Sequence, residues 1–330
     1  MASIKDVAKR AGVSVGAVSK YLKTPQNMRE QTRLRIEEAI QDLNFCPNPL
    51  AQSLRTGRTN IIAIALPEVD NPYFTKMFKL LQEQCEERGF LAMLLKNSNA
   101  EQANRNAGIL RSGLADGVIC YDEGQADAFI SAVNAYAPVV KLSTLPDSDY
   151  PATVCLDLRT GMQMLCRHLE ETGVRRLGYI GPDNDISSMQ KIQAIRDYCA
   201  AGNLQLDPSV FLTHCNSYST GYRCIREYLA SGQSLPDALV VESDMIAVGV
   251  LKGLIESGIR VPQDVRISGY DNTDLSQMSN PSLTTVHIPL EEICTCAMNM
   301  LCQLMNGQEA EILRFRTGLE IRTSTLSQEP

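Results

Sequence analysis

Two different hydrophobic rhythms divide the chain. In residues 1–45 the apolar residues are small and recur at helical spacing, as Ile36, Ala39 and Ile40 do. From residue 61 onward, continuous apolar runs of strand length such as IIAIAL alternate with amphipathic stretches such as NPYFTKMFKLLQEQCEERG. The first rhythm predicts a small helical unit, and the second predicts strands that alternate with helices.

The helical unit is expected to contain three short helices. Ser3, with Asp6 three positions later, has the spacing of a capping box, and Gly12 ends the first helix. Ser14 suits the N-cap of a second helix, and Thr32 suits the N-cap of a third. Two short helices joined by a tight glycine turn and supported by a third form a helix-turn-helix pattern.

The second of these helices carries almost no bulk in its first turns, which read VGAVS. Glycine inside a helix costs roughly 1 kcal/mol against alanine, so its presence calls for a reason. Small side chains would allow the helix to approach base edges and phosphates closely in a DNA major groove. A small three-helix bundle with a flexible glycine is the alternative interpretation.

The strand-like runs of the remainder fall into two series. IIAIAL, FLAMLL, DGVICY and PVVKLS form the first, and VCLD, RRLGYIG, VFLTH, ALVVES and VRISGYD form the second. Continuous apolar strands separated by amphipathic helices favour parallel sheets covered on both faces. We predict an α/β protein: a headpiece (1–45), a hinge helix and linker (46–60), and a core of two doubly wound lobes (61–330). A ligand cleft is expected between the lobes, at the carboxyl ends of the strands.

The segment FCPNPLAQSLRTGRTN joins the two parts. It has two prolines, then a short run that can be helical with Leu50 and Leu54 four positions apart, then a polar Gly-Arg stretch. Two interpretations remain open: a linker that folds against the body, or a hinge helix that becomes ordered only on DNA. In the second, Leu54 would act as an apolar wedge between base pairs.

Charge is unevenly distributed along the 330 residues. Residues 1–60 hold ten Lys or Arg and five Asp or Glu, a net charge of +5, while the whole chain has −7 and the remainder therefore −12. A basic head on an acidic body indicates an anionic partner for the head. No apolar run approaches the ~18 residues of a membrane span, and no signal-peptide pattern is present, so we expect a cytoplasmic protein without a membrane partner.

Candidate chemistry in the body is sparse. There is no GxGxxG after a strand, no GxxxxGK[ST], no GxSxG and no HExxH, so we expect neither an enzyme nor a cofactor. The eleven cysteines contain no CxxC pair, and the three histidines lie far apart. The cysteines are therefore expected to be small buried hydrophobes in a reducing compartment, with a metal site or a redox switch as less favoured alternatives.

Several stretches together resemble one family. IKDVAKRAGVSVGAVS, NPLAQSLRTGRTNIIAIALPEVDNPYF, VESDMIAVGVL, GIRVPQDVRISGYDN and PSLTTVHIP are similar to the lactose/galactose-repressor (LacI/GalR) family of bacterial transcription regulators. The resemblance implies a homodimer that binds a pseudo-palindromic operator as a repressor, through a helix-turn-helix headpiece. It also implies a two-lobed, periplasmic-binding-protein-like core that a small-molecule effector controls. The ending TSTLSQEP lacks a further heptad helix for tetramers, so a dimer is expected.

The resemblance also implies which residues touch DNA. They are Ser14, Val15, Gly16, Ser19, Lys20, Asn27, Thr32, Asn48 and Leu54. Lys20 could donate to guanine O6 and N7, and Val15 could touch a thymine methyl group. Ser14 and Thr32 have a second interpretation, as helix caps only. Because Gly16 and its neighbour Ala17 are smaller than the family's usual residues, more weight would fall on phosphate contacts and DNA shape.

The same resemblance implies the effector-binding residues. They are Asp70, Tyr73, Phe74, Lys191, Asn216, Ser243 and Asp271. A carboxylate and an aromatic platform suit a sugar. Packing at a helix start is the alternative for the two aromatic residues, and a strand-end cap is the alternative for Asp271.

Departures from the family pattern leave the effector class open. Lys191 stands where the family has an arginine and lacks its bidentate fork, and Ser243 stands where an asparagine is frequent. We expect a sugar or sugar phosphate, with a charged, phosphorylated or non-sugar ligand, or a protein co-regulator, as alternatives. The rival functions for the whole chain are a sugar-binding protein without specific operator binding, and an enzyme on the same sheet architecture.

Overall fold

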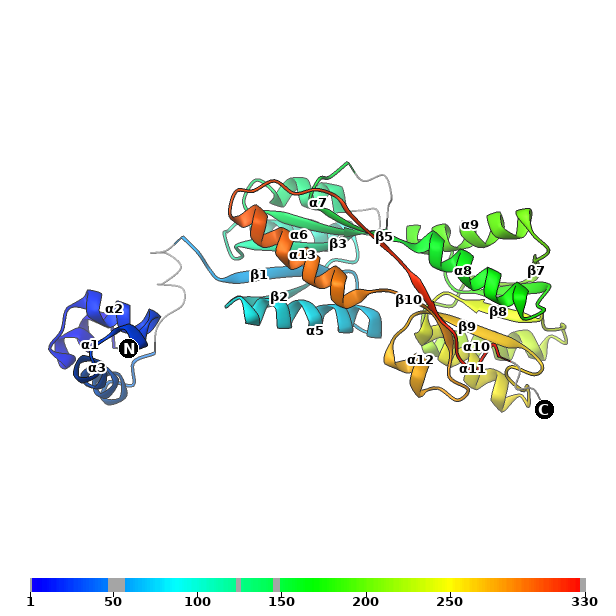
Figure 1. The fold of residues 1–330 in the computed structure, drawn as a ribbon, viewed down its shortest axis with the longest axis horizontal. Helices are drawn as coiled ribbons and strands as arrows, with labels where there is room; N and C mark the ends of the chain where they lie inside the picture. The colour runs from blue at the N-terminus through cyan, green and yellow to red at the C-terminus, as the bar shows by residue number, and fades with distance from the viewer. Residues whose placement is uncertain (1, 47–56, 123–125, 145–148, 327–330) are drawn as a thin grey trace. The chain divides into compact units, whose positions relative to one another are not determined.

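The structure is a computed structural model that describes residues 2–46, 57–122, 126–144 and 149–326 (Figure 1). The chain divides into two compact units, residues 1–59 and residues 60–330. The expected hinge helix, with Asn48, Leu50 and Leu54, lies outside the described residues. In the described part of the chain, no helix is both long and apolar enough to cross a membrane.

The first unit is the predicted three-helix unit. Its elements are α1 (Ile4–Ala11), α2 (Val15–Lys23), the 3₁₀ turn η1 (Pro25–Asn27) and α3 (Glu30–Asp42). The Ser3 hydroxyl accepts a bond from the Asp6 amide, and the Asp6 carboxylate accepts the Ser3 amide in return at 2.8 Å, so the capping box is confirmed. Gly12 ends α1 with φ +63°, a conformation that favours glycine.

The core of the headpiece is small. It consists of six buried side chains, Val7, Ala8, Ala11, Val18, Ile36 and Ala39. Five of these are alanine or valine, so little apolar area holds the three helices together. A headpiece of this kind has little stability to lose.

The first lobe of the second unit contains a six-stranded sheet in the order β11-β5-β4-β3-β1-β2. Its strands are β1 (Ile61–Leu66), β2 (Leu91–Lys96), β3 (Gly117–Asp122), β4 (Val139–Ser143), β5 (Thr153–Asp157) and β11 (Leu313–Arg316). All neighbouring strands are parallel. The helices of this lobe are α5 (Pro72–Glu87), α6 (Ala100–Leu110), α7 (Ala126–Val133) and α13 (Leu290–Met305).

The second lobe repeats the arrangement with the order β12-β10-β9-β8-β6-β7. Its strands are β6 (Arg176–Ile180), β7 (Gln205–Leu212), β8 (Ala238–Val241), β9 (Arg266–Asp271), β10 (Thr284–His287) and β12 (Gly318–Glu320). Only the β10–β12 pair is antiparallel among the pairings of these strands. The helices are α8 (Leu158–Glu171), α9 (Ile186–Ala201), α10 (Tyr218–Ala230), α11 (Asp244–Glu256) and α12 (Asp274–Met278).

The assignment of strands to lobes corrects one prediction. The run VCLD, expected to begin the second series, forms β5 and pairs with β4 and β11 in the first sheet. The chain then passes into the second lobe, returns for α13, which packs on α5, and crosses again between β11 and β12 (Figure 1). An apolar run predicts a buried strand but carries no sign of which sheet it joins, because both sheets bury such runs equally.

Candidate DNA-binding surface and effector cleft

The predicted recognition helix α2 begins as expected. The Ser14 hydroxyl accepts the Ala17 amide at 3.1 Å and so caps the helix. Val15, Gly16 and Lys20 are exposed on it, with 39% of Val15 accessible. A methyl group added at Gly16 would meet only the Ser14 hydroxyl, at 3.8 Å, which is an ordinary contact. Packing within the headpiece therefore gives no reason for a glycine at this position.

The other residues predicted to contact DNA differ in how exposed they are and in whether they cap a helix. Ser19 is partly buried in α2, and Asn27 is exposed at the end of η1. Thr32 is not an N-cap, because α3 already begins at Glu30 and Arg29 occupies the cap position without a side-chain bond. The helix starts earlier because Glu30 is an acidic residue suited to its first turn. The remaining two, Asn48 and Leu54, lie outside the described residues.

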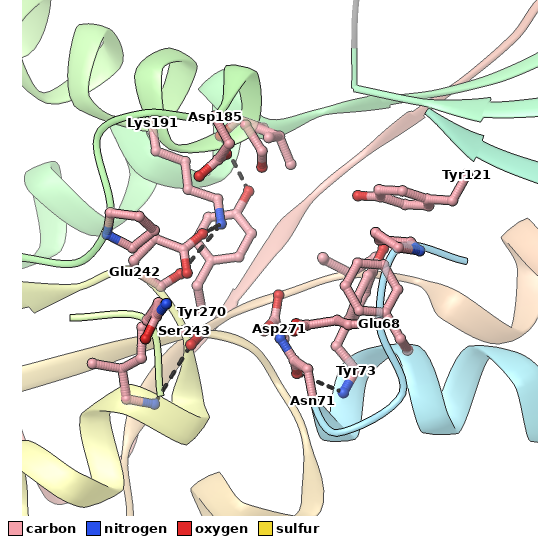
Figure 2. A pocket seen from close by; sticks show the side chains of 18 of the residues that line it. Glu68, Asn71, Tyr73, Tyr121, Asp185, Lys191, Glu242, Ser243, Tyr270 and Asp271 are labelled. Carbon is pink, nitrogen blue, oxygen red and sulfur yellow. Dashed lines mark hydrogen bonds and ion pairs between the residues drawn. The ribbon is translucent and has the colours of Figure 1, made fainter. Parts of the chain in front are cut away.

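A cavity of about 360 Å³ lies between the two lobes, at the carboxyl ends of their strands (Figure 2). This size lies within the range of small-molecule sites. The first lobe contributes residues such as Glu68, Asn71 and Tyr121, and the second contributes residues such as Lys191 and Asp271. Because both lobes line it, a ligand here would contact two bodies at once.

The structure brings six of the seven predicted effector residues to this cavity. They are Tyr73, Phe74, Lys191, Asn216, Ser243 and Asp271. Asp70 is the exception: it is exposed and outside the lining. Its neighbours Glu68 and Asn71 line the cavity instead, and Asn71 also caps α5 by accepting the Tyr73 amide at 3.0 Å. The turn before a capped helix start thus directs Glu68, rather than Asp70, toward the cavity.

An aromatic cluster forms the first-lobe wall. The rings of Tyr73 and Phe74 lie 5.0 Å apart, and both meet Tyr121 edge to face, at 6.3 and 5.0 Å. Tyr73 and Phe74 are each only 6% exposed. The two aromatic residues therefore pack in the core of the first lobe and also present an edge to the cavity.

A buried ion pair stands on the opposite wall (Figure 2). The Lys191 ammonium lies 2.5 Å from a Glu242 carboxylate oxygen, donates to the Glu242 carbonyl at 3.2 Å and lies 3.9 Å from the centre of the Tyr270 ring. Burial disfavours its charge, but attraction to the carboxylates of Glu242 and Asp271 is stronger and raises the pKa of Lys191. The ammonium is therefore held charged and already has close partners.

Asp271 ends β9 in a strained conformation. Its φ of +99° lies in the region that favours glycine, and the following Asn272 also has a positive φ, of +51°. Burial raises the pKa of Asp271 well above its usual range, Lys191 partly offsets this, and the carboxylates of Asp244 and Glu242 raise the pKa further. Such strain occurs where the surrounding structure holds a functional group in place.

Asp244 supports this wall from inside. Its carboxylate accepts bonds from the Thr273 amide at 2.7 Å, the Thr273 hydroxyl at 3.0 Å and the Thr285 hydroxyl at 2.6 Å. Burial nevertheless raises its pKa to about 6. Ser243, directly before it, is 2% exposed and is the N-cap of α11. Ser243 therefore has a structural role in addition to its place in the cavity lining.

The cysteines depart from the expectation of small buried hydrophobes at several places: Cys46 is exposed, and three others are only partly buried, Cys199, Cys296 and Cys302. Cys215 and Cys224 are joined as a disulfide across nine positions of sequence, next to the cavity residue Asn216. Cys120 is a buried thiol whose burial raises its pKa to about 12, as a small core hydrophobe would show. Among the residues that the structure describes, no cluster of His, Cys, Asp and Glu could hold a metal ion.

Sequence reasoning missed several cavity residues. Glu68, Glu242 and Tyr121 were not singled out, although each lies within two residues of the carboxyl end of an apolar strand. In parallel sheets, ligands bind at the carboxyl ends of strands, so these positions carried a usable signal. The pairing of Glu242 with Lys191, 51 positions away, carried none.

Comparisons with known proteins agree with this picture. Residues 3–48 match the description "Bacterial regulatory proteins, lacI family", and residues 166–325 match "Periplasmic binding protein-like domain". Catabolite control protein A of Staphylococcus epidermidis is 28% identical over 94% of each chain. The ribose operon repressor of Escherichia coli K12 is 29% identical over 91% of this chain and 92% of its own. Both names are those of regulators.

A solved structure has the same fold. The crystal structure of the Lac repressor dimer bound to operator and the anti-inducer ONPF superposes with a TM-score of 0.85, at 23% identity, over 99% of each chain. The predicted α/β architecture, with a helix-turn-helix unit and two sheet lobes, is therefore confirmed.

Proposed function

This chain belongs to the lacI family of bacterial regulatory proteins, and we propose that it acts as a cytoplasmic homodimeric repressor. In this proposal the headpiece binds a pseudo-palindromic operator, and a small molecule in the inter-lobe cleft controls that binding. A two-fold protein matches a two-fold DNA site, because each headpiece then reads one half-site.

The observation that carries the proposal is the exposed start of α2. Val15, Gly16 and Lys20 are accessible, and the fold gives no packing reason for Gly16. A surface without bulk beside a basic side chain suits a helix that enters the major groove, where Lys20 can donate to guanine. The net charge of +5 on residues 1–60 adds attraction to phosphates.

The cleft suits a polyhydroxylated effector, for which we propose a sugar or a sugar phosphate. Asp271 supplies a carboxylate acceptor, Asn216 an amide, and the edges of Tyr73 and Phe74 an apolar surface. Sugars are commonly held by such a combination of carboxylate bonds and aromatic contact. The names of relatives support a sugar, since one is called a ribose operon repressor.

Control of DNA binding would follow from closure of the lobes. The connections after β5, before α13 and between β11 and β12 join the lobes, and a ligand that contacts both walls favours one relative orientation. Such a coupling is expected to be about 1–3 kcal/mol. Whether ligand weakens or strengthens operator binding depends on which orientation holds the two headpieces at the operator spacing.

Selection from a random duplex library tests the proposal. The full-length protein should enrich duplexes with two related half-sites in inverted orientation, and two chains should bind each duplex in a stoichiometric titration. A Gly16→Glu variant, which adds bulk and negative charge at an exposed position, serves as the control and should enrich nothing. Enrichment of asymmetric sites by a single chain, or no enrichment by the wild type, would remove the proposal.

A further inference from the structure

The charges that line the cleft are unbalanced. Four carboxylates face it, those of Glu68, Asp185, Glu242 and Asp271, against two ammonium groups, those of Lys96 and Lys191. A pocket lined by an excess of one sign attracts the opposite sign and repels its own. The formal excess is thus negative, which bears directly on the class of ligand.

The Lys191 ammonium, the buried cation that could bind an anionic ligand, already has partners within the protein. Lys191 lies 2.5 Å from Glu242, donates to a backbone carbonyl and stands over the Tyr270 ring. An anionic ligand would have to displace the Glu242 carboxylate from this buried pair and leave that carboxylate uncompensated, which is costly. Lys96, the other cation, is exposed and therefore hydrated.

Two helix N-termini near the cleft, those of α9 and α11, carry acidic residues of the protein itself. Asp185 caps α9, where its carboxylate accepts the Ser188 amide at 2.8 Å and the Ser188 hydroxyl at 2.7 Å. Helix N-termini bind phosphates through such amides, but here a carboxylate of the protein has taken that position. At α11, the acidic Asp244 lies in the first turn.

Two carboxylates remain for the ligand. In the described parts of the chain, the side-chain carboxylates of Asp271 and Glu68 have no direct hydrogen-bond or ion-pair partner: Lys191 contacts Glu242 and only attracts Asp271 from farther away. They come from opposite lobes, at the end of β9 and in the turn before α5, and Figure 2 shows Asp271 between the two walls. Burial is the main cause of the raised pKa of Asp271, and repulsion from the Glu68 carboxylate adds to it. A donor-rich cation between them would satisfy both and relieve that repulsion.

We propose that the cleft selects a hydroxylated ammonium ligand, in the simplest case an amino sugar, and rejects its phosphorylated counterpart. This inference rests on the proposed function of the cleft as the effector site, and it narrows the two effector classes proposed there by excluding the sugar phosphate. Asp271 and Glu68 would accept bonds from the ammonium group and its neighbouring hydroxyls, and their engagement would draw the two lobes together. The Lys191–Glu242 pair determines specificity by removing the place where an anionic group would bind.

Matched ligand sets test the inference by the shift in melting temperature (Tm). Each set contains a neutral sugar, its amino sugar and its 6-phosphate. Glucose, glucosamine and glucose 6-phosphate form the first set, and the corresponding derivatives of galactose and mannose form two more. Tris serves as a minimal hydroxylated ammonium compound. The buffer is HEPES, since Tris or phosphate would compete. Ammonium members are expected to raise the Tm of the full-length protein by several degrees, neutral members less, and phosphorylated members not at all.

Three variants locate the effect. Asp271→Asn and Glu68→Gln should each weaken binding of the best ammonium ligand at least about tenfold, because a charge-assisted bond is roughly twice as strong as a neutral one. Glu68→Gln should also raise the Tm of the ligand-free protein, because it removes the repulsion between Glu68 and Asp271. Added salt screens that repulsion and should therefore reduce the Tm difference between the variant and the wild type. Asp70→Asn is the matched control. Because Asp70 is exposed and does not line the cavity, this variant should change neither the affinity for the ligand nor the Tm of the ligand-free protein.

The contrary results are distinct. A phosphorylated member that shifts Tm as much as its ammonium partner overturns the inference, and so does a panel in which no ammonium member shifts Tm. A lower Tm in Glu68→Gln than in Asp70→Asn also counts against it. None of these results touches the proposed operator binding, which the duplex selection judges separately.

Discussion

The headpiece and the core of this chain place their functional residues in opposite ways. In the headpiece, the candidate DNA contacts from Ser14 to Lys20 lie on one helix and its N-cap, and most of them are exposed. The core beneath them has only six buried side chains. In the core, the cleft collects residues from Pro67 to Ile288 around a buried ion pair. The first arrangement is local and marginally stable. The second is built by the tertiary fold and depends on partners distant in sequence.

The largest expected effect comes from the small core of the headpiece. Ile36 is fully buried there, and Ile36→Ala should cost about 2–5 kcal/mol, as deletions from well-packed cores do. A unit with so few buried side chains should then unfold at room temperature while residues 60–330 keep their own transition. Calorimetry would show the loss of one transition, and operator binding would disappear with it. A common downward shift of both transitions would contradict the independence of the two units.

Removing one partner of the buried pair should be the next largest effect. Lys191→Met leaves the Glu242 carboxylate buried and unpaired, so we expect a loss of about 3–5 kcal/mol in the unfolding free energy of the core. The double variant Lys191→Met/Glu242→Leu should recover most of it, because neither charge remains. Chemical denaturation measures both. If the single variant is as stable as the wild type, the ion pair is solvated and the account of the cleft is wrong.

A pH dependence should arise from Asp244. Its pKa is raised to about 6 in the folded protein, above its usual value near 3.8, so the folded state holds this proton more tightly than the unfolded state. Its contribution to stability therefore falls as pH rises through about 4 to 6, by about 1.4 kcal/mol per pH unit at most. Asp244→Asn should remove this slope. The difference in unfolding free energy between the two proteins, measured at several pH values, checks it; a constant difference would argue against a raised pKa.

The smallest expected effect is that of a substitution in α2 that should change headpiece stability and operator affinity in opposite directions. Gly16→Ala should stabilise the headpiece by up to about 0.5–1 kcal/mol, since the added methyl group makes only an ordinary contact with the Ser14 hydroxyl. It should weaken operator binding if DNA approaches closely there. Gly108→Ala is the matched control, since Gly108 lies in helix α6 with nothing within 4 Å of the added group. It should stabilise the core and leave operator binding unchanged. Operator binding that Gly16→Ala does not weaken would show that bulk at α2 is tolerated.

The same contrast explains what the sequence could predict. The capping box at Ser3, the Ser14 cap and the buried face of α5 were readable because each depends on neighbours within one or two turns. The sheet that β5 joins was not readable, since an apolar run is the same in either lobe. In the cleft, most of the lining residues could be predicted from their places near strand ends. Asp70 was the wrong prediction, because the turn before α5 directs Glu68 toward the cavity instead. The partner of Lys191 could not be predicted at all, because Glu242 lies 51 positions away and only the tertiary fold brings the two side chains together.

The salt dependence of DNA binding tests the central claim most directly. The full-length protein would be titrated onto a selected two-fold symmetric duplex and onto a scrambled duplex of the same composition, by fluorescence anisotropy at several salt concentrations. We predict affinity for the symmetric site at least about 10³-fold higher at physiological salt, and a fall of about 0.9 log unit per phosphate contact for each log unit of salt. Equal affinity for the two duplexes, or an affinity that does not change with salt, would contradict an operator-binding regulator.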